Sequence, residues 1–119
     1  MLDGINWKAA LDSVQGDRRL LAEVIEAFLE EYPRLVEQLA AAAAAGDAKG
    51  VQRVGHTIKG SMRCLGADDA ASAAAELEAL GRLGLPGDGR EQIEAVAREV
   101  ATVLPSLREF TRNELVRSQ

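Results

Sequence analysis

The stretch VGHTIKGSMRCLG, residues 54–66, decides the fold because its apolar residues recur at helical spacing. On a helical wheel of about 100° per residue, these residues and one just before the stretch form a single stripe. The stripe consists of Val51, Val54, Ile58, Met62 and Leu65. His56, the only histidine of the chain, lies on the opposite side of this wheel. We therefore expect a helix that buries the stripe and exposes His56 to solvent.

Two glycines, Gly55 and Gly60, lie on either side of His56 within this predicted helix. Glycine in a helix interior costs about 1 kcal/mol relative to alanine, yet the chain uses alanine freely elsewhere, with six in a row at residues 40–45. Gly60 lies one turn after His56 on the same face, so the missing side chain lets another molecule approach the imidazole. Gly55 points sideways, and the sequence leaves open whether it serves the site or allows close packing of a neighbouring helix.

Helical spacing extends over most of the remaining chain, and no segment alternates with the period of a strand. The predicted helices cover residues 6–14, 17–45, 47–65, 68–82 and 90–116. Each Gly-Asp pair, and the GADD segment at 66–69, offers a glycine to end one helix and an aspartate to cap the next. Pro33 and Pro105 fall inside the second and fifth segments, where we expect kinks rather than breaks because the apolar spacing continues.

Composition agrees with a helical architecture. Apolar residues make up 47% of the 119-residue chain but aromatic residues only 3%, so the core consists of Leu, Val, Ile and Ala. Such a core suits close helix packing better than a sandwich of strands. The predicted fold is all-α: an antiparallel four-helix bundle with a short extra N-terminal helix across one end. Residues 1–119 are expected to form one domain.

Charge and cysteine content exclude several function classes. The net charge of −5 argues against binding of nucleic acid, which requires a basic surface. A single cysteine, Cys64, cannot form an internal disulfide, and one histidine with one cysteine falls short of a structural zinc site, so no metal is expected. No run of 18 apolar residues and no signal-peptide start are present. We expect a soluble, cytoplasmic protein without a membrane partner.

The side of the predicted third helix that carries His56 is basic and polar. Within about 60° of His56 on the wheel lie Lys49, Gln52, Arg53, Lys59, Gly60 and Arg63. Segment 47–65 holds four cations against one acid, so it carries about +3 and the rest of the chain about −8 of the net −5. Positive charge therefore gathers around the histidine.

This environment suits a histidine that accepts a phosphoryl group. A neutral, exposed imidazole is a nucleophile, and nearby cations disfavour the imidazolium and attract phosphoryl oxygens. Lys59, three residues after His56, can reach towards a group bonded to the ring. No carboxylate or hydroxyl on the same helix is spaced to form a catalytic triad with His56. We therefore expect His56 to lack catalytic partners in this chain and a second molecule to supply the remaining chemistry.

The segment HTIKGS, residues 56–61, followed by LGA at 65–67, resembles the histidine-containing phosphotransfer (HPt) domain of bacterial multistep phosphorelays. The order of FLEEYP at 28–33, the Gly-Asp pair at 46–47, the histidine motif and ELEAL at 76–80 also follows this family. The pattern H-x-x-K-G alone is weak, but its place on the third helix of a chain of this length makes it specific.

The resemblance implies a four-helix bundle in which His56 is phosphorylated, Lys59 is the phosphate-side cation and Gly60 admits a receiver domain. It also implies a carrier without a kinase site of its own. This carrier takes the phosphoryl group from an aspartyl phosphate on the receiver of a hybrid sensor kinase and passes it to the receiver of a response regulator. Mg²⁺ belongs to the receiver, so no cofactor is expected on this chain. The candidates for docking an acidic receiver are Lys49, Gln52, Arg53 and Arg63.

Two other functions stay open from the sequence. The same bundle could be an interaction module that binds a receiver or another regulator without taking phosphate. It could also be a small enzyme that uses His56 as acid or base, although no second catalytic group stands at a readable spacing. The sequence does not decide whether the chain is a separate protein or a piece of a longer kinase, nor does it identify the donor, the acceptor or the phosphorylated ring nitrogen.

Overall fold

The computed structural model describes residues 3–85 and 87–117, and within these residues it contains five helices and no strand. The helices are α1 (Trp7–Ser13), α2 (Arg18–Ala44), α3 (Ala48–Cys64), α4 (Asp68–Arg82) and α5 (Arg90–Arg117). Each end lies within one residue of the range predicted from the sequence. The all-α prediction is confirmed.

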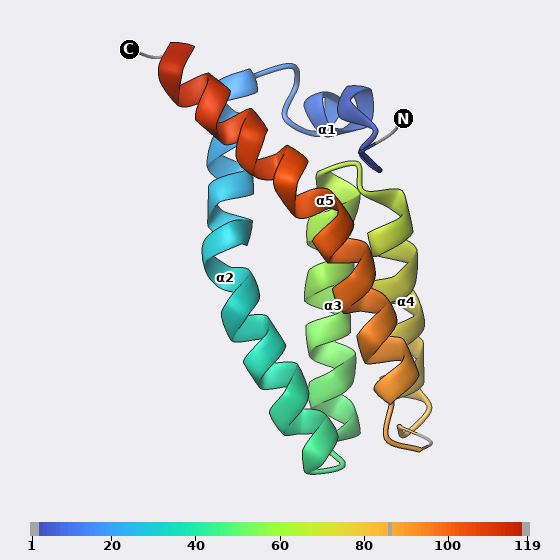
Figure 1. Ribbon diagram of the computed structural model, residues 1–119. Coiled ribbons are helices and arrows are strands. Elements are labelled where there is room, and N and C mark those ends of the chain that lie inside the picture. Colours follow the sequence, from blue (N-terminus) through green and yellow to red (C-terminus); the bar gives the residue numbers. More distant parts are fainter. Residues whose placement is uncertain (1–2, 86, 118–119) are drawn as a thin grey trace.

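The four long helices alternate in direction along the bundle (Figure 1). Helix α3 packs between α2 and α4, and α5 closes the bundle against α2 and α4 on the side diagonal to α3. The short α1 lies across the end at which α3 finishes and α4 begins (Figure 1). The structure is therefore the predicted antiparallel four-helix bundle with a short N-terminal helix, and one long side of α3 faces solvent.

Most helix starts follow the predicted capping chemistry. Side chains of Asn6, Asp17 and Asp47 accept hydrogen bonds from backbone N–H groups in the first turns of α1, α2 and α3. Helix α4 is an exception, because its N-cap is Ala67 and no side chain caps it. The two aspartates of the GADD segment instead lie in the first turn of α4, where negative charge is favoured by the helix dipole.

Neither proline breaks its helix. Helix α2 continues through Pro33, and α5 continues through Pro105. The course of α2 changes direction near its middle (Figure 1). Since proline removes a backbone hydrogen bond and crowds the preceding turn, a bend of this kind is its expected effect.

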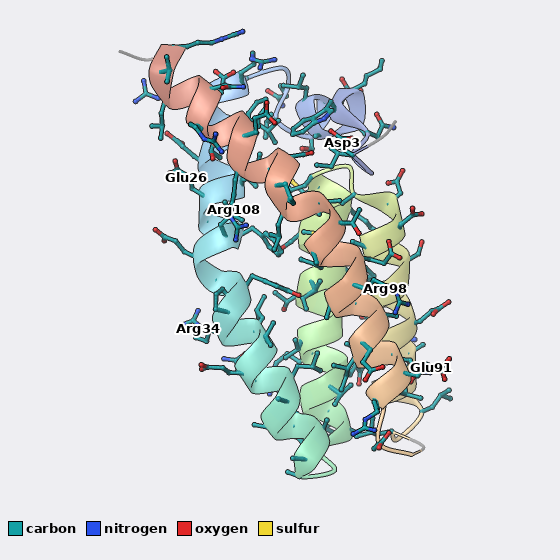
Figure 2. All side chains as sticks on the ribbon, viewed as in Figure 1. Asp3, Glu26, Arg34, Glu91, Arg98 and Arg108 are labelled. Carbon is teal, nitrogen blue, oxygen red and sulfur yellow. The ribbon has the colours of Figure 1, made fainter. Side chains whose placement is uncertain are left out.

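The core is aliphatic, as the composition predicts. All members of the apolar stripe on α3 are at most 2% exposed. They form one core cluster with fully buried residues of the other long helices, including Leu21, Ile25, Leu77, Val100 and Leu107. At the α1 end, the Trp7 ring stacks on the Phe110 ring with 5.0 Å between centroids. Most charged side chains lie on the surface, among them Glu26 on α2 and Arg98 on α5 (Figure 2), whereas Glu78 and Glu114 are buried.

Helices α3 and α4 approach each other more closely than side chains would permit. A Cβ atom at Gly55 would lie 2.8 Å from the backbone N of Glu78, and one at Gly81 would lie 2.5 Å from the backbone N of Gln52. Both distances are too short for a real contact, so each glycine lets one helix backbone rest against the other. Of the two roles that the sequence left open for Gly55, the structure supports helix packing. A Cβ at Gly60, by contrast, would meet no atom within 4 Å.

Replacing Gly55 or Gly60 by alanine should therefore change the stability of the protein in opposite directions. Gly55→Ala forces backbone atoms apart, and we expect it to lower the free energy of unfolding by about 1–3 kcal/mol. Gly60→Ala removes only the conformational cost of glycine, and we expect it to raise that free energy by about 0.5–1 kcal/mol. Urea unfolding of both variants measures the difference. Equal stabilities would show that α3 and α4 are not in backbone contact at Gly55.

Candidate functional site around His56

His56 lies near the middle of α3 with its side chain 70% exposed. Its Nδ1 atom is 2.8 Å from Oε2 of Glu78, a residue of α4. Within the described residues, Nε2 has no hydrogen-bond partner. One ring nitrogen is therefore held by the protein, and the other is open to solvent.

Glu78 is a buried carboxylate that joins three side chains. Its side chain is 8% exposed, and its second oxygen, Oε1, accepts a hydrogen bond of 2.5 Å from Nζ of Lys59. One guanidinium nitrogen of Arg82, one turn further along α4, is 3.7 Å from Oε2. The carboxylate thus links His56 and Lys59, both on α3, to α4. His56 therefore has a hydrogen-bond partner in this chain, but on a different helix from its own, where the sequence did not indicate one.

A groove of about 370 Å³ runs between α2 and α3 beside Gly60. Its walls are mainly apolar and include Val24, Ala27, Phe28 and Leu35 of α2 and Gly60 and Cys64 of α3, while Glu31 and Ser61 add polar groups. Leu20, one turn before Val24 on α2, is 42% exposed. Because the walls come from two helices, spacing along either helix alone did not indicate the groove. The open backbone at Gly60 therefore adjoins a surface that can receive an apolar partner.

A family model of the Hpt domain matches residues 23–109 of this chain. The chain belongs to the Hpt domain family. The HPt domain of the Hpt sensor hybrid histidine kinase from Shewanella has a similar structure, with a TM-score of 0.81 over 95% of this chain and 97% of that one. The two sequences are 19% identical, so this likeness supports the fold. A comparison with curated proteins by sequence gives no match.

The role of this Hpt domain is phosphotransfer in a phosphorelay. Hpt domains are phosphocarrier modules rather than kinases, and they interact with receiver domains. No helix in the described part of the chain is long and apolar enough to cross a membrane. No group of His, Cys, Asp and Glu side chains among those residues could hold a metal ion. The absence of a cofactor and the cytoplasmic location stay predictions.

The residues that the sequence indicated around His56 are divided between two sides of α3 in this Hpt domain. We call the side that faces α4 the α4 flank and the side that faces α2 the α2 flank. Lys59 lies on the α4 flank, where its side chain is only 17% exposed and bonds to Glu78. Gln52 lies on the same flank and is half-buried, with its backbone against Gly81. Gly60 lies on the α2 flank, beside the groove.

The three remaining cations of the predicted docking set, Lys49, Arg53 and Arg63, are exposed. Lys49 and Arg63 stand seven residues before and after His56, so the three side chains follow one ridge of α3. Within residues 3–85 and 87–117, no ion pair engages any of these cations. Their role in docking stays a prediction, and their charges are available to a partner.

The pKa of the Glu78 carboxyl lies below its ordinary value of 4.5. The hydrogen bond from Lys59 is the largest cause, burial acts in the opposite direction, and the bond from His56 lowers the pKa further. The carboxyl is therefore ionised at neutral pH. An ionised carboxylate can only accept hydrogen bonds, so the hydrogen between Glu78 and His56 belongs to Nδ1.

Sequence reasoning placed Glu78 in the segment ELEAL but gave it no role. A usable signal was present in the helical spacing of α4. Ala71, Ala74, Glu78 and Gly81 recur three and four residues apart, so a carboxylate interrupts a stripe of small residues. An acid on a face that packs against another helix requires a partner, but the spacing alone did not indicate which helix supplies it.

Replacing Glu78 by glutamine should make stability depend less on pH. At pH 7 we expect Glu78→Gln to lower the free energy of unfolding by about 1–3 kcal/mol, because Lys59 and His56 lose a charged acceptor. When the pKa of a carboxyl is lower in the folded protein than in the unfolded protein, the carboxyl stabilises the fold at pH values above the unfolded-state pKa. This contribution is lost as the pH falls through the folded-state pKa. The difference between wild type and variant should therefore shrink below about pH 4.5. Urea unfolding of the wild type and the variant, measured from neutral pH to acid, tests this pH dependence.

Glu76→Gln provides the matched control, because Glu76 is an exposed residue of the same helix. Its effect on the free energy of unfolding should stay within about 0.5 kcal/mol. A difference between wild type and Glu78→Gln that does not change from pH 7 to acid would contradict the assigned charge of Glu78.

Proposed function

We propose that His56 accepts a phosphoryl group on Nε2 from an aspartyl phosphate on the receiver domain of a hybrid sensor kinase, and passes it to the receiver of a response regulator. The observation that carries this proposal is the 2.8 Å bond between Nδ1 and Glu78 on a ring that is 70% exposed. With the hydrogen on Nδ1, the lone pair of Nε2 is free and directed to solvent.

Phosphoryl transfer to this ring is a displacement at phosphorus. The Nε2 lone pair forms the N–P bond while the P–O bond to the receiver's aspartate breaks, and the electrons of that bond return to the aspartate carboxylate. The second transfer is the reverse, with a different receiver. Mg²⁺ on the receiver would neutralise the phosphoryl oxygens. The residues of this chain hold the ring in position and leave the approach to Nε2 open.

Docking of the receiver is proposed to use the α2 flank of α3. An apolar surface of the receiver would occupy the groove, and the backbone at Gly60 would allow the close approach that transfer needs. Arg53, Lys49 and Arg63 then attract an acidic receiver surface, and Gln52 lies further towards α4. The apolar walls of the groove and the unpaired charges on the ridge support this arrangement.

The two other functions are less well supported. An interaction module without phosphorylation would not need a histidine whose tautomer is selected by a buried carboxylate. An enzyme that uses His56 with Glu78 as an acid–base pair would need a pocket over the ring for its substrate. The ring instead stands on an exposed ridge, and the groove begins beside Gly60 rather than over Nε2.

His56→Gln should abolish phosphoryl acceptance without unfolding the protein, because the side chain is mostly exposed. The assay mixes the protein with receiver domains phosphorylated in the presence of Mg²⁺ and looks for an acid-labile, base-stable label on this chain. Circular dichroism checks the fold of the variant. Label on His56→Gln would overturn the assignment of His56. Binding to several receivers without label on the wild type would favour the interaction module.

Two substitutions test the docking surface. Gly60→Leu should block transfer by steric conflict while the bundle stays folded, since the position opens to solvent. Ala27→Asp adds a further negative charge to the groove, next to its apolar walls, and should weaken receiver binding about tenfold or more, the effect of disrupting a buried interface position. Ala101→Asp, at an exposed alanine of α5, is the matched control. Equal dissociation constants for the two aspartate variants would show that the receiver does not bind in the groove.

A further inference from the structure

We infer that Glu31 determines which receiver docks on this Hpt domain, by selecting one that carries a lysine or arginine at the edge of its apolar docking surface. The inference rests on the proposed function, because it concerns the receiver that would occupy the groove beside Gly60. It assigns partner choice to a residue of α2, outside the helix that carries His56.

Glu31 puts a negative charge into a groove that is otherwise uncharged. It is the only charged residue among the described residues that line the groove, and it shares the groove with Gly60 and Ser61 of α3. The Glu31 side chain is 45% exposed. Its carboxylate is therefore accessible to a partner in the groove, and it would lose water when that partner docks.

Within residues 3–85 and 87–117, the ion pair that engages Glu31 is a weak one. It joins Oε1 of Glu31 to a guanidinium nitrogen of Arg34 at 4.0 Å, the outer limit for such a pair. Arg34 is 69% exposed, does not line the groove and lies on the outer side of α2 (Figure 2). Exposed pairs of this kind contribute little, so the charge of Glu31 is left for a partner.

The two helices that form the groove present charges of opposite sign. Helix α3 holds four bases and no acid, and three of the bases form the exposed ridge of Lys49, Arg53 and Arg63. Glu31 stands on the α2 wall. A receiver that spans the ridge and the groove therefore matches this surface when it places acidic groups over the ridge and a cation over Glu31. The pattern also sets the orientation of the receiver, because a reversed orientation would bring like charges together.

The position of Glu31 makes it discriminate between receivers as well as attract one of them. A carboxylate that loses water in an apolar groove weakens binding unless a cation pairs with it. A receiver with only apolar residues at this point leaves the charge unpaired, and a receiver with an acid there adds repulsion. Specificity is a difference of affinities, so the apolar walls suit many receivers and Glu31 decides among them.

Charge reversal at Glu31 tests the inference, with a purified receiver domain that labels the wild type as the probe. Glu31→Lys should raise the receiver concentration for half-maximal transfer about tenfold, because like charges then meet in the groove. The rate at saturation should stay unchanged, since His56 and its hydrogen bond to Glu78 are untouched. Glu31→Gln should shift the half-maximal concentration in the same direction by a smaller factor.

Glu30→Lys is the matched control, because Glu30 is an exposed acid one residue earlier that does not line the groove. It makes the same change in net charge, and the half-maximal concentration should change by less than about twofold, as for an exposed charge. Urea unfolding of each variant checks that the bundle keeps its stability.

A charge swap then identifies the cation of the receiver. Each lysine and arginine beside the apolar docking surface of the receiver is changed singly to glutamate. One of these receiver variants should bind the wild type about tenfold more weakly and should recover its affinity with Glu31→Lys, a coupling that a double-mutant cycle measures. Glu30→Lys should not restore it.

Three results would overturn the inference: equal effects of Glu31→Lys and Glu30→Lys, a loss confined to the rate at saturation, or no receiver variant whose affinity Glu31→Lys restores. Self-association of the wild type that Glu31→Lys abolishes, with receiver binding unchanged, would also overturn it and assign the groove to a second copy of this chain.

Receiver binding is also measured by fluorescence anisotropy without a phosphoryl donor, so the inference and the proposed function can fail separately. A receiver whose affinity depends on Glu31 but which transfers no label would overturn the proposed function and leave the role of Glu31 standing. Label on His56 with a half-maximal concentration that Glu31→Lys does not change would have the opposite meaning.

Discussion

The backbone contact between α3 and α4 is the constraint on which the site depends. Gly55 and Gly81 remove the side chains that would separate these helices, and Glu78 stands where a Cβ at Gly55 would meet its backbone. Only at this separation does the Glu78 carboxylate reach His56 and Lys59 together. The glycine before His56 and the glycine after it therefore differ: Gly55 brings Glu78 close to the ring, and Gly60 leaves open space on the other flank.

The two flanks of α3 divide the chemistry between them. On the α4 flank, the buried Glu78 carboxylate bonds to Nδ1 of His56 and to Nζ of Lys59. On the α2 flank, an apolar groove and a bare backbone offer a surface for docking. His56 stands on the ridge between them, so the proposed receiver would reach Nε2 without disturbing the hydrogen bond at Nδ1. This separation suits the proposed carrier, which would meet its donor and its acceptor through the same exposed atom.

Much of the fold follows from local chemistry. Apolar spacing marked every helix, and the aspartates at 17 and 47 cap their helices as expected, because capping depends on a few neighbouring residues. The expected aspartate cap of α4 was wrong, since Ala67 occupies that position and the acids act in the first turn. Among site residues, the exposure of His56 and the open space at Gly60 were predictable from the wheel of one helix.

The sequence by itself determined the helices, their buried faces and the histidine that stands in solvent, because these depend on spacing within one segment. Only the tertiary structure decided that Glu78 bonds Nδ1 and that Lys59 turns away from the solvent face to meet it. It also decided that α2 and α3 form a groove beside Gly60. Each of these features joins side chains of two helices, so it depends on the distance and rotation between helices. Spacing along a single helix carries no information about either.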